Sequence, residues 1–298
     1  MTRPRIGVQY TPPPGQDITT TVRASREIEA MGYASFTLPD HLTRPHDHGT
    51  AAVPAPFALL ARIAADTTTI ALGTMTVLDA LRLPAHTVRS AVTLQQISGG
   101  RFELGIGAGW QPADLDVLAP AARPAGARIR ALEQTLQLLR QAWPLPGTTA
   151  PDGRDGTLAR TLADGTQAPR LIVAAGTSAL LRLAARHADE VALTVPTRRR
   201  LHGVTPSADS VAAQIATARA ARPPGAPLCG FHLQIRALGP AVPLEPDGDW
   251  WTVGGSPGQV ADALRRRAAA GVTHLGVCTE DLHLLEWLAS RVLPQCEG

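Results

Sequence analysis

Short β-rich apolar runs alternate with amphipathic stretches along the whole chain. Regular alternation of strand and helix is typical of βαβ units, which build a parallel sheet. We predict eight such units. The predicted strands are 5–9, 34–38, 68–75, 101–106, 171–174, 189–193, 229–235 and 272–277, and the predicted helices are 18–31, 56–65, 84–97, 126–143, 178–187, 207–221, 257–270 and 282–293.

Eight units predict an α/β fold that closes into a (β/α)8 TIM barrel; the alternative is a doubly wound open sheet, which usually has fewer strands. The stretch 145–170 is rich in Gly, Pro and Thr, has no helical period and is too long for an ordinary connection. We therefore predict a short insertion between strands 4 and 5, with at most a small hairpin. The length of 298 residues and the hydrophobic fraction of 44% fit a single domain over residues 1–298.

Composition excludes several classes of function. All 28 basic residues are arginine, the net charge is +3, and only 198–200 and 265–267 form basic clusters. A nucleic-acid binder would carry a continuous basic stripe with stacking aromatics, so we expect no nucleic-acid partner. No apolar run approaches the roughly 20 residues of a membrane span, and the N-terminus has no apolar signal core, so we expect a cytoplasmic protein without membrane contact. The three cysteines are too few and too widely spaced for a disulfide framework or a zinc site.

Chemistry in a barrel collects where the strands end. Asp40 and His41 follow the second predicted strand. Histidine transfers protons near neutral pH, and a neighbouring carboxylate can orient donors around it. We predict that His41 and Asp40 are catalytic; the alternative is a loop pair with surface hydrogen bonds.

Three further strand ends, at 73–76, 105–110 and 175–178, are candidates for holding a cofactor. A glycine at a strand end marks either a plain bulge or a close approach of a ligand to the backbone. The glycines of 105–110 are a weak dinucleotide fingerprint, because the third glycine is misplaced. The segment 175–178 opens a helix whose free N–H groups attract anions, although simple capping is the alternative. The predicted cofactor-binding residues are Gly73, Thr74, Met75, Gly107, Ala108, Gly109, Trp110, Ala175, Gly176 and Thr177.

His46, Asp47 and His48 could open a metal site at a barrel strand end. Such a site needs further ligands on later strands. His232 and His274 fall inside predicted strands, and we find no carboxylate set to match them. We therefore predict no metal site and interpret 46–48 as the solvated rim of an active site.

The chain resembles the luciferase-like monooxygenase superfamily, particularly its branch that uses coenzyme F420. The resemblance covers nearly the whole chain and rests on the segments 29–33, 39–41, 70–74, 93–110 and 253–260. The block from Ser-Gly-Gly-Arg to Gly-Trp within 93–110 is specific, and the others are supportive. The resemblance implies a barrel with the cofactor at its C-terminal mouth, usually as a homodimer. It also implies that the backbone at Gly73 and Thr74 supports the ring and that Gly176 and Thr177 contact the cofactor phosphate.

Three positions depart from the pattern of that family. Leu83 stands where a histidine often precedes Pro84, and Asp114 stands where a glutamate is common. Trp110 replaces the glutamate of a deazaflavin-dependent sugar-phosphate dehydrogenase subgroup, which argues against that oxidation. The reactions that remain are reduction of a C=C, C=N or C=O bond and oxidation of another substrate.

The resemblance therefore favours an F420-dependent oxidoreductase that acts on a small organic molecule, more readily as a reductase. An FMN-dependent monooxygenase on the same barrel is the alternative, followed by a flavin-binding barrel without catalysis and a metal-dependent hydrolase that uses His46 and His48. Because F420 ends in a tail of glutamates, we expect Arg198–Arg200 to hold that tail; a solvated loop is the other interpretation.

Overall fold

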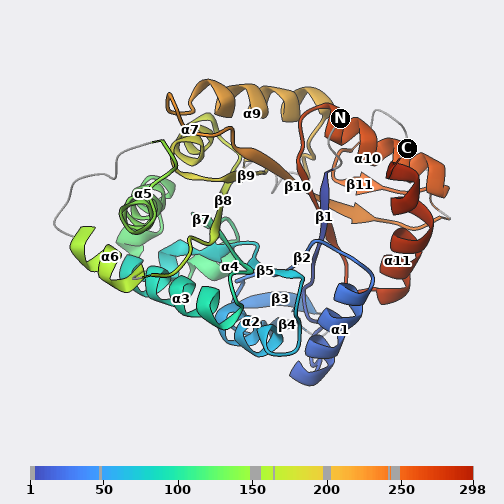
Figure 1. Cartoon of the computed structure of the whole chain (residues 1–298), viewed down its shortest axis with the longest axis horizontal. Helices are drawn as coiled ribbons and strands as arrows, with labels where there is room; N and C mark the ends of the chain where they lie inside the picture. Colours follow the sequence, from blue (N-terminus) through green and yellow to red (C-terminus); the bar gives the residue numbers. More distant parts are fainter. Residues whose placement is uncertain are drawn as a thin grey trace.

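The structure, a computed structural model, describes residues 4–46, 49–147, 156–163, 165–196, 203–240, 242 and 249–297. Eight parallel strands form a closed barrel, and helices lie around it (Figure 1). The barrel strands are β1 (Arg5–Gln9), β2 (Ser35–Leu38), β5 (Ala71–Thr74), β7 (Phe102–Gly107), β8 (Arg170–Ala175), β9 (Glu190–Leu193), β10 (Gly230–Ala237) and β12 (His274–Cys278). Pairing of β9 with β10 closes the sheet, so the predicted (β/α)8 barrel is confirmed.

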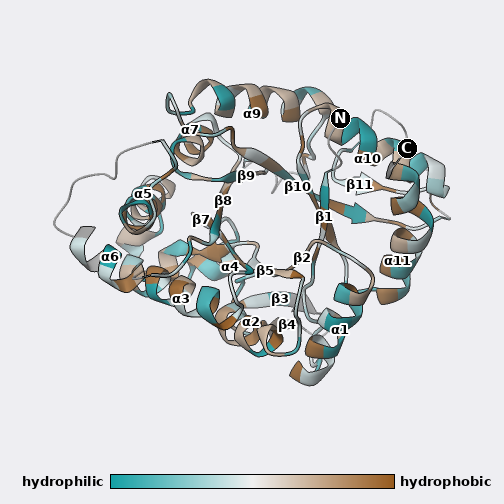
Figure 2. Ribbon diagram, in the orientation of Figure 1, coloured by the Kyte–Doolittle hydropathy of each residue, from teal (hydrophilic) through white to brown (hydrophobic). Residues whose placement is uncertain are grey.

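The helices that follow the strands begin and end close to the predicted positions. They are α1 (Ile18–Ala30), α2 (Pro56–Ala64), α3 (Pro84–Ile97), α5 (Ala125–Ala142), α7 (Ser178–His187), α9 (Ala208–Ala220), α10 (Pro257–Ala269) and α11 (Leu282–Trp287). Local chemistry explains these starts: Pro84 stands in the first turn of α3, and Ser256 and Gln259 form a capping box on α10. Figure 2 shows apolar and polar residues mixed along the helices, as amphipathic packing requires.

One prediction about the connections is wrong. The segment between β7 and β8 holds a helix, α6 (Gly156–Ala163), where we expected at most a hairpin. Ala159 and Ala163 are buried, and α6 packs on α3 and α5, so tertiary contacts stabilise a stretch whose own pattern is weak. The hairpin lies instead after β2, where β3 (Thr43–His46) pairs with β4 (Gly49–Ala52).

Four short elements and a changed helix end were not predicted. The additions are β6 (Val77–Leu78), which pairs with β7, β11 (Thr252–Val253), which pairs with β10, the helix α4 (Pro112–Leu115), and a 3-10 turn at Asp79–Leu81. The predicted closing helix 282–293 is α-helical only to Trp287 and continues as a π-helix at Leu288–Val292. No described helix has the length and apolar character needed to cross a membrane.

Alternate strand positions face two different environments. Phe102 and Phe231 point outward, because they contact Phe57 on α2 and Arg219 on α9. Their neighbours Glu103 and His232 point into the barrel, because they face Arg5 and Glu190 from other strands. The apolar core therefore lies between the sheet and the helices, whereas the lower barrel interior is polar.

The first part of the most specific sequence block, residues 98–101, stabilises the fold. In the turn 98–101, both glycines have positive φ (63° and 89°), which only glycine adopts freely. Arg101 donates hydrogen bonds to the carbonyl oxygens of Ala64, Thr67 and Ile70. Its guanidinium therefore ties the end of α2 and the start of β5 to the turn between α3 and β7.

Candidate active site

An open cleft with about 1030 Å³ of empty space lies at the C-terminal mouth of the barrel. Most of the residues that the sequence selected line it. They are Asp40, His41, Met75, Gly107, Ala108, Gly109, Trp110, Gly176 and Thr177. The strands thus bring residues more than a hundred positions apart to one surface.

Gly73, Thr74 and Ala175 do not line this cleft. Thr74 is fully buried, and its hydroxyl donates to the carbonyl oxygen of Gly105 at 2.7 Å and accepts from the Gly105 N–H at 3.1 Å. These bonds join β5 to β7 just below the cleft. The next peptide bond, between Met75 and Thr76, is cis, and both residues line the cleft.

A histidine–aspartate pair occupies one wall of the cleft. His41 Nδ1 lies 2.6 Å from Oδ2 of Asp114, and the other carboxylate oxygen accepts the backbone N–H of Leu42 at 2.9 Å. Asp114 is 2% exposed, whereas His41 is 31% exposed. Because the carboxylate accepts from Nδ1, the opposite ring nitrogen, Nε2, is left to exchange a proton with a ligand.

Trp110 lies beside this pair and faces the same cleft. Its ring meets the His41 imidazole edge-on, with centroids 5.8 Å apart and an interplanar angle of 89°. An indole packed in this way restricts the rotation of the imidazole. The pair His41–Asp114 together with Trp110 is therefore preorganised for proton transfer to a bound molecule.

Asp40 lines the cleft but directs its oxygens away from His41. Its carboxylate accepts from the Leu78 N–H at 2.9 Å and forms a two-pronged ion pair with Arg82. Burial raises the pKa of Asp40, and the Arg82 hydrogen bond and charge oppose that rise. This geometry favours a positioning role, in which Asp40 fixes the wall formed by Leu78.

Two glycines shape the cleft by allowing close packing. A Cβ on Gly109 would lie 2.2 Å from the Leu78 side chain, and the residue has φ of +81°. A Cβ on Gly176 would lie 2.7 Å from the carbonyl oxygen of Thr194. Both positions therefore require glycine for the packing of neighbouring loops, and the exposed backbone that results is what a flat ligand could contact.

The N-terminus of α7 opens toward the cleft. Thr177 caps it by accepting the N–H of Leu180 at 3.3 Å, and both residues line the cleft. The other N–H groups of the first turn, at Ser178 and Ala179, have no partner within the helix. Free N–H groups at a helix N-terminus are able to bind anions such as phosphate.

Sequence reasoning did not select every residue at the mouth. Gln9 and Gln234 line the cleft from β1 and β10, and the Gln234 amide donates to Gln9. Asp114 stood out only as a departure from a family pattern, and its pairing with His41 spans 73 positions. Alternate side chains of a strand point to the same face, and both glutamines occupy inward positions near strand ends. This alternation was the signal that could have identified them.

Three other predictions concern residues that do not line the cleft as described. Arg198–Arg200 and the metal candidate at 46–48 lie outside the residues whose side chains the structure describes. The expectation that no carboxylate matches His232 and His274 is wrong, because Glu190 lies beside both. Glu190 is the first residue of its strand, 84 positions from His274, so only closure of the barrel brings the three together.

The luciferase-like monooxygenase family model matches residues 1–237. An uncharacterised protein of Mycobacterium tuberculosis is 30% identical over 139 residues, which are 42% of this chain and 48% of that protein. The 4-hydroxyprotoasukamycin monooxygenase of Streptomyces nodosus is 31% identical over 120 residues, 40% of this chain and 31% of the enzyme. The matches thus span about half of the first relative and about a third of the second.

Solved structures resemble the whole chain in fold. An F420-dependent secondary alcohol dehydrogenase in complex with an F420-acetone adduct superposes with a TM-score of 0.74, 15% identity and full coverage of both chains. The oxygenating constituent of 3,6-diketocamphane monooxygenase from Pseudomonas putida, in complex with FMN, gives 0.68 and 15%, covering 98% of this chain and 99% of that one. The matched family, the closed barrel and the cleft at its C-terminal mouth agree, and the chain belongs to the luciferase-like monooxygenase family.

Proposed function

We propose that this protein is an oxidoreductase that uses reduced coenzyme F420 to reduce a small organic substrate at the C-terminal mouth of the barrel. The observation that carries the proposal is the His41–Asp114 pair, which lines the cleft next to Trp110. Reduction of a C=O, C=N or C=C bond consumes one hydride and one proton. A histidine oriented by a buried carboxylate suits the proton half of that reaction.

The cleft offers a fitting place for the phosphate and for the flat ring of the cofactor. The N–H groups at the start of α7, next to Gly176 and Thr177, would hold the phosphate. The exposed backbone at 107–109 and the segment at Met75 and Thr76 would lie against the flat ring. When bound, the reduced deazaflavin supplies a hydride, since carbon replaces the reactive ring nitrogen of flavins.

The residues of this chain would supply position and the proton. His41 holds a proton at Nε2 and donates it to the substrate atom that becomes negative as the hydride arrives. Asp114 keeps the Nδ1–H bond and stabilises the imidazole during the transfer. Trp110 packs against the imidazole, and Asp40 with Arg82 keeps the Leu78 wall in place.

An FMN-dependent monooxygenase is the second candidate, and one observation favours it. No arginine is among the described residues that line the cleft, so the site as described suits one phosphate better than a polyglutamate tail. Arg198–Arg200, which follow β9 in the sequence, are the cations that would meet the tail in the F420 proposal.

The remaining expectations complete the proposal. As members of this type usually do, the chain would form a homodimer, which light scattering after size exclusion measures. The proposed setting is the cytoplasm.

Competitive binding tests the choice of cofactor. The full chain is titrated with F420 and with FMN, and oxidation of reduced F420 is then followed without oxygen over a panel of ketones, imines and enones. The proposal expects tighter F420 binding and substrate-dependent oxidation of the reduced cofactor. Preference for FMN, with oxygen consumed in proportion to product, supports the second candidate instead.

A further inference from the structure

Three chelating side chains meet inside the barrel, below the floor of the mouth cleft. His232 lies two residues before the floor residue Gln234 on β10, and Glu190 and His274 are the first residues of β9 and β12. These strands are neighbours in the sheet. The three side chains, here called the barrel triad, are 0% to 2% exposed.

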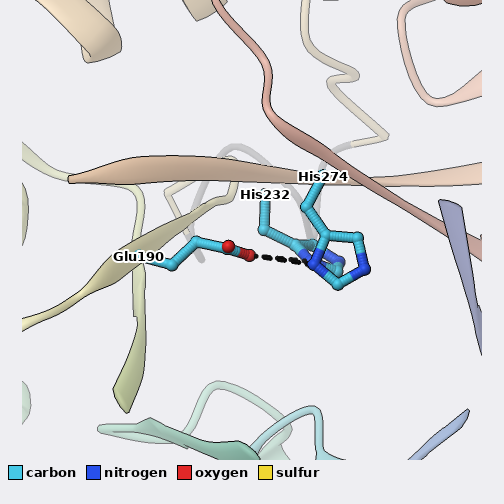
Figure 3. Close-up of side chains that lie close together, drawn as sticks. All are labelled: Glu190, His232 and His274. Atoms are coloured by element: carbon cyan, nitrogen blue, oxygen red, sulfur yellow. Dashed lines mark hydrogen bonds and ion pairs between the residues drawn. The ribbon is translucent and has the colours of Figure 1, made fainter. Parts of the chain in front are cut away.

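The barrel triad converges on one carboxylate oxygen (Figure 3). Glu190 Oε1 lies 3.1 Å from His274 Nδ1 and 3.3 Å from His232 Nδ1. One donor atom from each residue falls within 4.8 Å of the others. Two imidazoles and one carboxylate are ligands that zinc and related transition metals accept.

His232 is the member whose hydrogen bonding is incomplete. Its Nδ1 is close to Glu190, but the contact lacks hydrogen-bond geometry, and neither ring nitrogen has a hydrogen-bond partner among the described residues. Burial and the neighbouring His274 lower the pKa of His232. Leaving such a group buried without a partner is unfavourable, which calls for a ligand at this ring.

The surroundings orient the other two side chains. His274 Nε2 lies 3.1 Å from the Ser35 hydroxyl, so its Nδ1 is directed at Glu190. The second oxygen of Glu190 accepts from Arg170 at 2.7 Å. Partners of this kind, which fix the ring orientation and bind the free oxygen of a carboxylate, are typical of metal sites.

Glycines make room for the imidazoles. A Cβ on Gly276 would lie 2.6 Å from His232 Nε2. A Cβ on Gly7 would lie 1.9 Å from the Ser35 hydroxyl and 3.0 Å from His274 Nε2. The barrel interior, which large aliphatic side chains fill in most TIM barrels, here accommodates polar rings.

We propose that Glu190, His232 and His274 bind a divalent transition-metal ion, with Zn²⁺ as the fitting species, inside the lower half of the barrel. Metal–ligand bonds of about 2.0–2.1 Å separate adjacent ligand atoms by roughly 3.0–3.4 Å, and the two distances to Glu190 fall in that range. The site replaces the sequence expectation of no metal. It is independent of the proposed function, because no member of the barrel triad lines the mouth cleft.

The positive charge of Arg170 opposes binding of the metal ion. Its guanidinium neutralises Glu190, so a cation must share the carboxylate with it or displace it. Arg170 is 37% exposed and lines an open cleft at the N-terminal end of the barrel, into which it can turn. Glu103, which pairs with Arg5 through one oxygen, has its other oxygen buried without a partner and adds negative charge to the interior. The ion and Arg170 therefore compete for the carboxylate of Glu190.

This competition gives a test with effects in opposite directions. The full chain is stripped with a chelator and titrated with Co²⁺, followed by its visible absorption, and then with Zn²⁺ in competition. We expect one ion per chain, His232→Gln to weaken binding at least about tenfold, and Arg170→Gln to strengthen it several-fold, because a like charge is removed. A His46→Asn/His48→Asn variant should bind as the parent does.

Two results would overturn the proposal. One is that neither the parent nor Arg170→Gln binds Co²⁺ with a defined absorption band. The other is that binding survives His232→Gln in full or disappears with the 46/48 variant. If His232→Gln does not fold, Ser35→Ala replaces it, and binding by that variant at parental strength counts against the site, since the His274 ring would have lost its support.

Discussion

The two ends of the barrel use the same strands for opposite purposes. At the mouth, His41 is 31% exposed and one of its ring nitrogens faces an open cleft. At the lower end, Glu190 and His274 are fully buried and bonded to other side chains. Gln234 and His232 stand two residues apart on β10, yet one lines the cleft and the other belongs to the barrel triad. Depth along a strand, more than residue type, separates groups that can react from groups that hold the barrel together.

The comparison predicts that a change at the mouth affects turnover far more than stability. His41→Asn should lower kcat/KM by about 10²–10⁴-fold, because the proton donor is lost. The free energy of unfolding should stay close to that of the parent, since the side chain is partly exposed. Steady-state rates with reduced F420 and urea unfolding measure the two. A stable variant with parental kcat/KM would remove His41 from the mechanism.

The part of the fold and of the site that could be predicted from the sequence differs between the two ends of the barrel. Helices such as α3 and α7 and the glycine-rich strand ends follow from local patterns, so the barrel and most of the mouth could be predicted. The partners could not: Asp114 reaches His41 across 73 positions, and Glu190 reaches His274 across 84. Those contacts depend on strand register and barrel closure, which no local pattern contains.

At the lower end, the largest expected effect is on stability. Glu190→Ala leaves Arg170 and His274 without their buried partner, which should lower the free energy of unfolding by about 3–5 kcal/mol. Urea unfolding measures the loss. The double variant Glu190→Leu/Arg170→Leu is the control, and it should recover part of the stability because both charges are removed. Equal stability of Glu190→Ala and parent would contradict the contrast between the two ends.

Gly176→Asp tests the anion site at α7. The new carboxylate repels the phosphate, and cofactor affinity should fall well over tenfold in a fluorescence titration. Gly176→Asn is the matched control, because any side chain meets Thr194 at this position. The charge effect is the difference between the two variants, and equal affinities would place the phosphate elsewhere.

Glu29 supplies a pH test of stability away from the mouth. Burial acts to raise its pKa, but the N–H groups of Ile70, Thr69 and Thr68 lower it from 4.5 to about 2. Since the folded pKa is depressed, its stabilisation is present above pH 4.5 and declines as the pH falls toward 2. Glu29→Gln should therefore lower the free energy of unfolding by about 1–2 kcal/mol at pH 7, and by progressively less between pH 4.5 and 3. A difference that does not change with pH would show that the charge of Glu29 is irrelevant.

The smallest expected effect concerns the cofactor tail. Replacing Arg198, Arg199 and Arg200 by alanine should weaken F420 binding several-fold at low salt and less at high salt, because exposed charges are screened. FMN binding should change much less. Unchanged F420 affinity at low salt would mean that the tail does not contact this segment.

The central claim is that the mouth of this barrel is built for the deazaflavin. The most direct measurement is purification of the full chain from a host that makes both cofactors, followed by absorbance and mass analysis of what co-purifies. We expect F420 in the bound fraction of the parent and little or none when Gly176→Asp is purified in the same way. Bound FMN in the parent, together with turnover that consumes oxygen, would contradict it.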